Sequence, residues 1–140
     1  MENLKRFYIN GEWVDPISDR TMEVTNPATE ETIGSVALGN AKDVDSAVAA
    51  ANAAFDEFSQ TSKLDRLDLL KSVMVITERR LEDLAQAMRM EMGAPITMAR
   101  SSQADAAIGH LQGFIDALEE HNERAKLKNG DIMVHEPVGV

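Results

Sequence analysis

Apolar and polar residues alternate in short runs over the first forty positions of the chain, a pattern typical of β-strands. The stretch 7–14 turns at Asn10-Gly11, the pair that best tolerates the positive φ angles of a two-residue hairpin turn. A second pair of strands, over 22–37, turns through 26–31, where a proline presets one backbone dihedral angle. The pattern predicts two antiparallel hairpins within residues 7–38.

From residue 40 onward the apolar residues recur every three or four positions, the period of an amphipathic helix. Asp43 follows Asn40 by three positions, and Asp65 follows Ser62 in the same way. This spacing is typical of helix starts, because the two side chains can cap each other's backbone N–H groups. The period predicts three helices, over 41–59, 62–92 and 97–123.

Two local features subdivide this helical region. The charged cluster at 78–80 predicts a kink or break within the second helix. Gly93 suits the end of that helix, because glycine enters the left-handed backbone region without steric cost. The third helix carries an apolar face broad enough to be covered on two sides.

The end of the chain returns to alternation. Residues 128–131 have turn composition, residues 131–135 alternate like a half-buried strand, and Pro137 interrupts the pattern before the apolar run 138–140. A buried strand needs neighbouring elements to cover it. We therefore expect the chain to be the front part of a longer protein.

Composition narrows the classes of function. The chain of 140 residues is 44% apolar, has only 4% aromatic residues and contains no cysteine, which excludes disulfides and thiolate sites within it. Its net charge of −10 repels phosphate backbones and anionic lipid, so we expect no nucleic-acid partner and no membrane partner. No signal peptide or membrane-spanning run is predicted.

Five motifs follow one another along the chain: Tyr8-Ile9-Asn10-Gly11-Glu12-Trp13, Asn26-Pro27-Ala28-Thr29, Asp43-Val44-Asp45-Ser46-Ala47-Val48, Gly93-Ala94-Pro95 and Glu136-Pro137-Val138-Gly139-Val140. In order and spacing they resemble the N-terminal third of the aldehyde dehydrogenase superfamily, and the match covers essentially the whole chain. The resemblance implies an α/β parent fold of Rossmann type. Within it this fragment is mainly α-helical, with N-terminal antiparallel hairpins and a C-terminal strand.

The resemblance also implies a domain assignment and a function. Residues 1–125 would form the N-terminal part of the NAD(P)-binding domain, and residues 126–140 would begin the oligomerisation strands. The parent protein would be a cytoplasmic homo-oligomer that oxidises an aldehyde to a carboxylic acid with NAD or NADP. The alternative is a non-catalytic helical module that acts by association through its exposed apolar faces.

In this family the reaction uses a cysteine thiolate, a glutamate base and an asparagine, while a lysine and a Gly-rich turn hold the nucleotide. The resemblance places all of these downstream of Val140. No catalytic and no cofactor-binding residue is therefore expected within the chain, and the fragment alone is predicted to be inactive.

One position departs from the family pattern. Glu30 stands where members usually carry glycine after the Asn-Pro-Ala-Thr motif, at a place where the turn needs a left-handed residue. A residue with a side chain costs roughly 1 kcal/mol there. The hairpin is expected to be looser or one residue longer.

The resemblance suggests one metal site within the chain. Many family members hold a monovalent cation near the N-terminal hairpin, through carbonyls of the strand before Asn-Pro and an acidic side chain before the Gly-x-Pro turn. The corresponding ligands here are the carbonyls of Val24 and Thr25 and the carboxylate of Glu91. Hard oxygen ligands suit Na⁺ or K⁺. The alternative is that Glu91 caps backbone amides or faces water.

The three histidines offer no helical spacing for a shared metal ion, so solvated or capping roles are expected for His110, His121 and His135.

Overall fold

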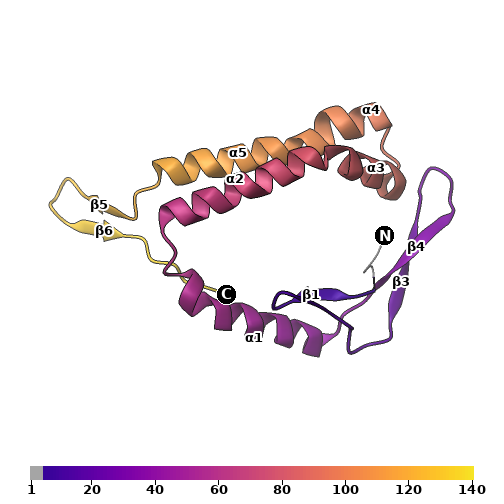
Figure 1. Ribbon diagram of the computed structural model, residues 1–140, viewed down its shortest axis with the longest axis horizontal. Coiled ribbons are helices and arrows are strands. Elements are labelled where there is room, and N and C mark those ends of the chain that lie inside the picture. Colours follow the sequence, from indigo (N-terminus) through magenta and orange to yellow (C-terminus); the bar gives the residue numbers. More distant parts are fainter. Residues whose placement is uncertain (1–4) are drawn as a thin grey trace.

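The computed structural model describes residues 5–140, which form an open arrangement of helices and three small antiparallel hairpins (Figure 1). The strands are β1 (Phe7–Ile9), β2 (Glu12–Val14), β3 (Thr21–Thr25), β4 (Thr32–Ala37), β5 (Arg124–Lys126) and β6 (Ile132–Val134). The helices are α1 (Ala41–Phe58), α2 (Lys63–Arg79), α3 (Leu81–Met92), α4 (Ile96–Met98), the π-helix η1 (Ala99–Ala104) and α5 (Asp105–Glu120). The predicted class, helical with N-terminal antiparallel hairpins, is confirmed.

The first hairpin forms as its turn residues predict. β1 pairs with β2 through three residue pairs, from Phe7 opposite Val14 to Ile9 opposite Glu12. Asn10 and Gly11 occupy the turn with φ angles of 52° and 80°. Both angles are positive, as a two-residue hairpin turn requires.

Both predicted capping boxes are present. The Asn40 side chain accepts from the Asp43 N–H, and the Asp43 carboxylate accepts from the Asn40 N–H at 2.8 Å. Ser62 and Asp65 exchange the same pair of bonds at the start of α2. These bonds satisfy backbone donors that a first helical turn leaves free, and they fix where α1 and α2 begin.

The second predicted helix is two helices in the structure. α2 ends at Arg79 and α3 starts at Leu81, with Arg80 at φ −107° between them. The break falls within the charged cluster at 78–80, as the sequence indicates. The stretch 62–92 is helical as predicted, but it forms two helices instead of one continuous helix.

The prediction of a third helix over 97–123 is wrong in two respects: the first part is not a regular α-helix, and the helix ends before residue 123. Its first turns are α4 and a π-helix, and α5 stops at Glu120. Arg124–Lys126 instead forms β5, which pairs with β6 in a third hairpin. The N–H of His135 donates to the carbonyl of Glu123 at 2.9 Å and closes the base of that hairpin. The expected single C-terminal strand is therefore one half of a hairpin, and no strand forms at 138–140.

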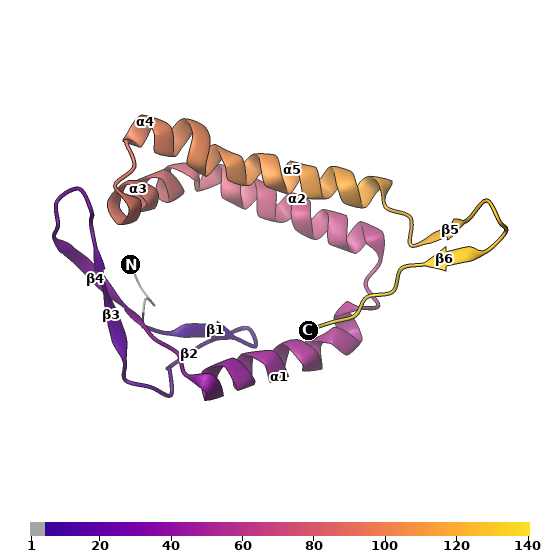
Figure 2. The same cartoon turned by 180° about the vertical axis from the view of Figure 1, so that it is seen from behind.

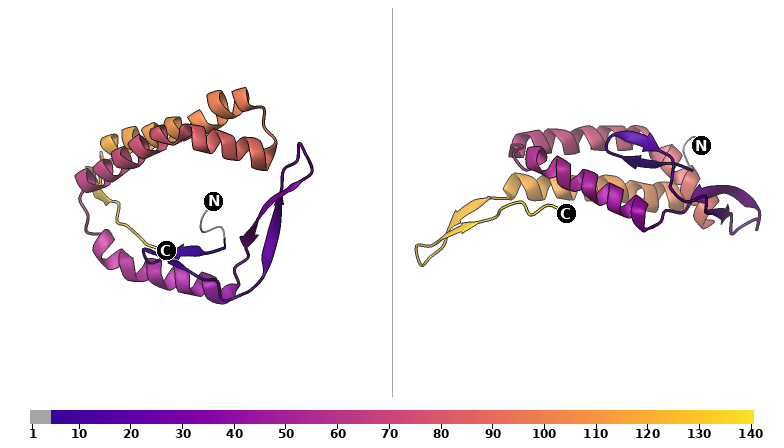
Figure 3. Two further views of the ribbon diagram at one scale, coloured as in Figure 1. Left: turned by 45° about the vertical axis from the view of Figure 1, so that its right-hand side comes forward. Right: turned by 90° about the horizontal axis from the view of Figure 1, so that it is seen from below.

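The packed core is small. α2 packs along α5, and the buried apolar residues are Leu67, Ala85, Ala99, Ala104 and Ile115. α1 and the first hairpin lie on the other side of the molecule, away from the α2–α5 pair (Figures 2 and 3). The accessible surface is 10450 Å². A compact protein of this mass exposes about 7,200 Å². The chain therefore leaves uncovered much apolar surface that a compact domain would bury.

Candidate functional site

The turn between β3 and β4 is held by its own hydrogen bonds. The Asn26 side chain accepts from the N–H of Ala28 at 2.9 Å, an Asx-type bond. The Asn26 N–H donates to the carbonyl of Glu31, and the Glu30 N–H donates to the carbonyl of Asn26. Glu30 has a φ of 61°, so it occupies the left-handed position that the family resemblance implies for this residue. The turn retains its hydrogen bonds despite the glutamate.

The end of α3 lies against this turn (Figure 1). Gly93 ends the helix in the left-handed region with φ 69°, as predicted. A Cβ at this position would lie 2.9 Å from Cγ of Pro27 and 3.7 Å from the N of Ala28. Glycine is required at this position for two reasons: its φ is positive, and a Cβ would collide with Pro27. It joins two segments that are more than sixty residues apart in the sequence.

This contact brings together the regions that carry the proposed cation ligands. Val24 is half-buried and Thr25 exposed in β3, and Glu91 is exposed in the last turn of α3. The pairing register shifts between Val24 and Thr25, from Gly34 to Thr32 on β4. The extra residue of this bulge is Ile33 of β4, whereas Val24 and Thr25 each keep a partner on that strand. Carbonyl and carboxylate oxygens are the hard ligands expected for Na⁺ or K⁺.

A second polar cluster fixes the junction between α3 and the π-helix. The guanidinium of Arg100 binds both carboxylate oxygens of Glu82, at 2.8 and 2.6 Å. The hydrogen bonds from Arg100, and then that from Gln86, lower the pKa of Glu82 to about 2. The same contact raises the pKa of Arg100. Both side chains are exposed, so the pair orients two helices more than it stabilises them.

The π-helix Ala99–Ala104 packs its two buried alanines against Ala85 of α3. The Oε1 atom of Gln103, a residue of the same π-helix, is buried and accepts no hydrogen bond from residues 5–140. Single π-turns within α-helices are frequent at functional sites. The sequence pattern gave no signal for this element, because a π-turn keeps helical composition and changes only the hydrogen-bond ladder.

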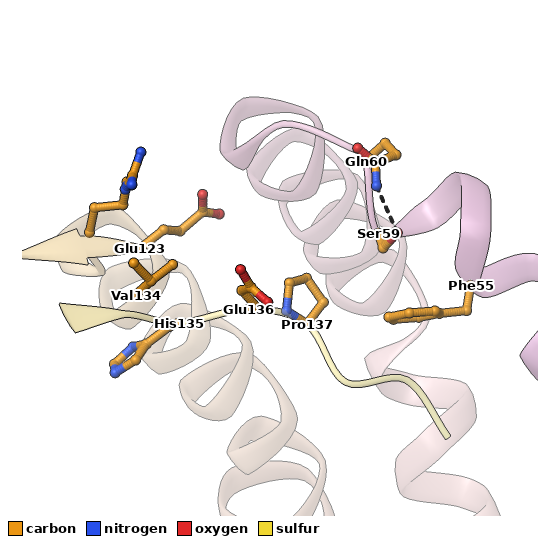
Figure 4. Close-up of a pocket in the computed structure, with 9 residues that line it drawn as sticks. Phe55, Ser59, Gln60, Glu123, Val134, His135, Glu136 and Pro137 are labelled. Carbon is orange, nitrogen blue, oxygen red and sulfur yellow. Dashed lines mark hydrogen bonds between the residues drawn. The ribbon is translucent and has the colours of Figure 1, made fainter. Parts of the chain in front are cut away.

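A third region lies where the C-terminal segment returns to α1. A cavity of about 600 Å³ opens between Phe55 and Ser59 on one side and Glu123, His135 and Pro137 on the other (Figure 4). Gly139 approaches the Phe55 ring so closely that a Cβ would lie 3.1 Å from it. This contact returns the chain end to the end of α1.

The structure brings two of the three histidines together. The rings of His121 and His135 stack with centroids 5.3 Å apart and planes at 18°. Sequence spacing could not reveal this contact, because the β5–β6 hairpin creates it. Within residues 5–140 no group of three or more His, Cys, Asp or Glu side chains could hold a metal ion. His110 is exposed on α5.

In the part of the chain that the structure describes, every helix is too short or too polar to cross a membrane. The sequence model of the aldehyde dehydrogenase family matches residues 13–140. A relative from Staphylococcus saprophyticus, named for the same family, is 41% identical over all 140 residues. The chain covers 29% of that relative's length.

Solved structures agree with this match. The aldehyde dehydrogenase of Bartonella henselae superposes with a TM-score of 0.89 at 38% identity, over 94% of this chain and 28% of that one. A mutant of aldehyde dehydrogenase C from Pseudomonas syringae, in complex with NAD⁺ and octanal, gives 0.86 at 41% identity, over 88% and 25%. The Mycobacterium tuberculosis enzyme with NAD⁺ gives 0.85 at 28% identity, over 95% and 29%.

Proposed function

The chain belongs to the aldehyde dehydrogenase family, and on that basis we propose that it is the N-terminal part of an enzyme that oxidises an aldehyde to a carboxylic acid with NAD or NADP. The observation that carries the proposal is the family match over residues 13–140, supported by 41% identity to a relative along the whole chain. Neighbours of similar fold are complexed with NAD⁺, and one also with octanal.

The residue types present in the chain indicate which functions it can and cannot supply to the parent enzyme. The chain contains no cysteine, so a thiolate nucleophile must come from elsewhere in the parent protein. None of its glycines forms a Gly-x-Gly-x-x-Gly run, so these residues do not fit a nucleotide phosphate cradle of that type. The 140 residues supply scaffold, and we assign the catalytic and nucleotide-binding groups to the remaining part of the enzyme, which we place in the cytoplasm as a homo-oligomer.

The test compares the 140-residue chain with the protein encoded by the reading frame extended past Val140. We expect aldehyde-dependent formation of NADH or NADPH only from the extended protein, and its loss when a downstream cysteine is changed to alanine. Turnover by the 140-residue chain alone, or an extended protein without such a cysteine, would refute the proposal.

We also propose that Val24, Thr25 and Glu91 form a site for Na⁺ or K⁺. Support comes from the contact of Gly93 with Pro27, which brings the end of α3 to the turn that follows Val24 and Thr25. Glu91→Gln should weaken Na⁺ binding measured by sodium relaxation, while the exposed Glu12→Gln in the first hairpin should not. Equal binding by both variants would support the reading in which Glu91 only faces water.

The alternative function, a non-catalytic association module, has one observation in its favour. The accessible surface of 10450 Å² leaves apolar faces on α1, α2 and α5 without a cover. The extended-frame experiment separates the two functions, because a module would have no Rossmann strand or cysteine-containing segment to add.

A further inference from the structure

The chain contains two Asn-Gly pairs, and both lie in hairpin turns. Asn10-Gly11 joins β1 to β2, and Asn129-Gly130 lies between β5 and β6. Asn-Gly is the dipeptide in which the glycine nitrogen most readily attacks the asparagine side chain, because glycine adds no side chain to hinder ring closure. From the different bonding of the two turns we infer that Asn10 is a site of spontaneous deamidation and isoaspartate formation, whereas Asn129 is protected.

The reaction needs water and no other partner. The backbone nitrogen of Gly11 attacks Cγ of Asn10, the new N–Cγ bond forms, and the Cγ–Nδ2 bond breaks. The amide NH₂ leaves as ammonia with the proton that the Gly11 nitrogen has lost. Water then opens the resulting succinimide at either carbonyl carbon, and gives aspartate or isoaspartate. The reaction involves no oxidation or reduction, so it needs no electron acceptor.

The first turn leaves these reacting atoms free. Asn10 and Gly11 are exposed, and within residues 5–140 neither the Asn10 side chain nor the Gly11 N–H makes a hydrogen bond. Nothing lies within 4 Å of the position of a Gly11 Cβ, so the space for the ring is open. Only three residue pairs hold the hairpin, and two-stranded hairpins of this size open easily.

The second turn holds the same atoms in place. The Gly130 N–H, which would be the nucleophile, donates to the carbonyl of Leu127 at 3.0 Å. Oδ1 of Asn129 accepts from the N–H of Asp131 at 3.1 Å, and Nδ2 donates to its carboxylate at 2.6 Å. That carboxylate also opposes the negative charge that develops on the attacked amide. The β5–β6 ladder likewise has three residue pairs, so ladder length does not separate the two turns.

Conversion at Asn10 would change the first hairpin. Isoaspartate carries the main chain through its side-chain carbon, which adds one main-chain atom to a two-residue turn and so changes the geometry that joins the two strands. The turn sets the register in which Tyr8 and Trp13 meet edge to face, with ring centroids 5.3 Å apart. Trp13 is the only tryptophan of the chain, so its fluorescence reports on this hairpin alone.

The experiment incubates the 140-residue chain at mildly alkaline pH and follows both sites by peptide mass spectrometry, with a protease that cleaves at aspartate but not at isoaspartate. Asn10 should convert at least about tenfold faster than Asn129, the ratio that one or two hydrogen bonds correspond to. Trp13 emission should shift in step with isoaspartate at position 10.

Three variants test the mechanism. Asp131→Ala removes the carboxylate that accepts from Nδ2 of Asn129, one of the three hydrogen bonds of this turn, together with its negative charge, and should narrow the rate gap. Lys128→Ala, in the same turn, should leave the gap unchanged. Freshly prepared Asn10→Asp adds the charge without the longer main chain and should keep the original Trp13 emission. Conversion of Asn129 as fast as Asn10, conversion at neither site, or an unchanged gap in Asp131→Ala would overturn the inference.

Discussion

The carboxylate of Asp43 accepts a hydrogen bond from the backbone N–H of Ile17 at 3.0 Å, across 26 positions of sequence. Its other oxygen accepts from the N–H of Asn40 at 2.8 Å. Asp43 therefore caps α1 and also ties the loop between the two N-terminal hairpins to that helix. It is the only buried charged side chain among residues 5–140, with 7% of its surface exposed.

Asp43→Ala should lower the free energy of unfolding by about 2 kcal/mol, because hydrogen bonds to a charged group contribute roughly 1.5–3 kcal/mol and the N–H groups of Ile17 and Asn40 both lose their acceptor. Chemical denaturation measures the loss. The exposed neighbour Asp45→Ala, on the same helix, should change stability by less than about 0.5 kcal/mol. Equal effects of the two substitutions would contradict the tertiary role of Asp43.

The Glu82–Arg100 pair predicts a pH dependence. The pKa of Glu82 is lowered to about 2 from its ordinary value of 4.5 by Arg100 and Gln86. Because the folded pKa lies below the unfolded one, the contribution of the pair is complete above pH 4.5 and is lost as the pH falls toward 2. Arg100→Met should raise the pKa of Glu82 in a carboxyl NMR titration, while Arg79→Met should leave it unchanged. A normal Glu82 titration in the unaltered chain would disprove the bidentate contact.

Gly93→Ala should destabilise the chain by about 1–3 kcal/mol, since alanine at φ 69° is strained and its Cβ would meet Pro27 at 2.9 Å. Gly109→Ala is the matched control, because Gly109 lies inside α5 with open space around it. That change should stabilise by about 0.5–1 kcal/mol through helix propensity. The two variants should thus move the thermal midpoint in opposite directions.

Glu30→Gly should stabilise the chain by up to about 1 kcal/mol, because glycine adopts the φ of 61° without steric cost. Glu31→Gly in the same hairpin should not stabilise, since Glu31 has no positive φ to relieve. Thermal denaturation measures the change in stability of each variant. A gain of the same size in both would mean that charge, and not backbone strain, is responsible.

The chain should self-associate in spite of its net charge of −10. Leu69, Val73 and Ile76 follow one another at helical spacing on α2 and are 52%, 40% and 49% exposed. A large apolar surface seldom stays in water on a monomer. Light scattering should show species heavier than 15.4 kDa, and Val73→Lys should reduce them more than Ser72→Lys does. A monodisperse monomer with a sharp melt would contradict this expectation.

Capping and turn residues determined much of the local structure from the sequence alone. Asn40 with Asp43 and Ser62 with Asp65 mark helix starts, Gly93 marks a helix end, and Asn10-Gly11 marks a turn. Each signal acts within about four residues, so backbone sterics and one or two local hydrogen bonds are sufficient. The left-handed position of Glu30 was expected from the family resemblance and not from the residue itself, because members of the family usually carry glycine there.

Only the tertiary structure decided which distant groups meet. The bonds from Ile17 to Asp43 and from Arg100 to Glu82, and the stacking of His121 on His135, join residues whose separation carries no periodic signal. The end of α5 at Glu120 was likewise decided at a distance, because the backbone of 124–126 pairs with β6 instead of continuing the helix. The composition of residues 121–126 is compatible with either a helix or a strand. The hydrogen bonds of a strand come from a partner elsewhere in the chain, whereas those of a helix come from its own next turn.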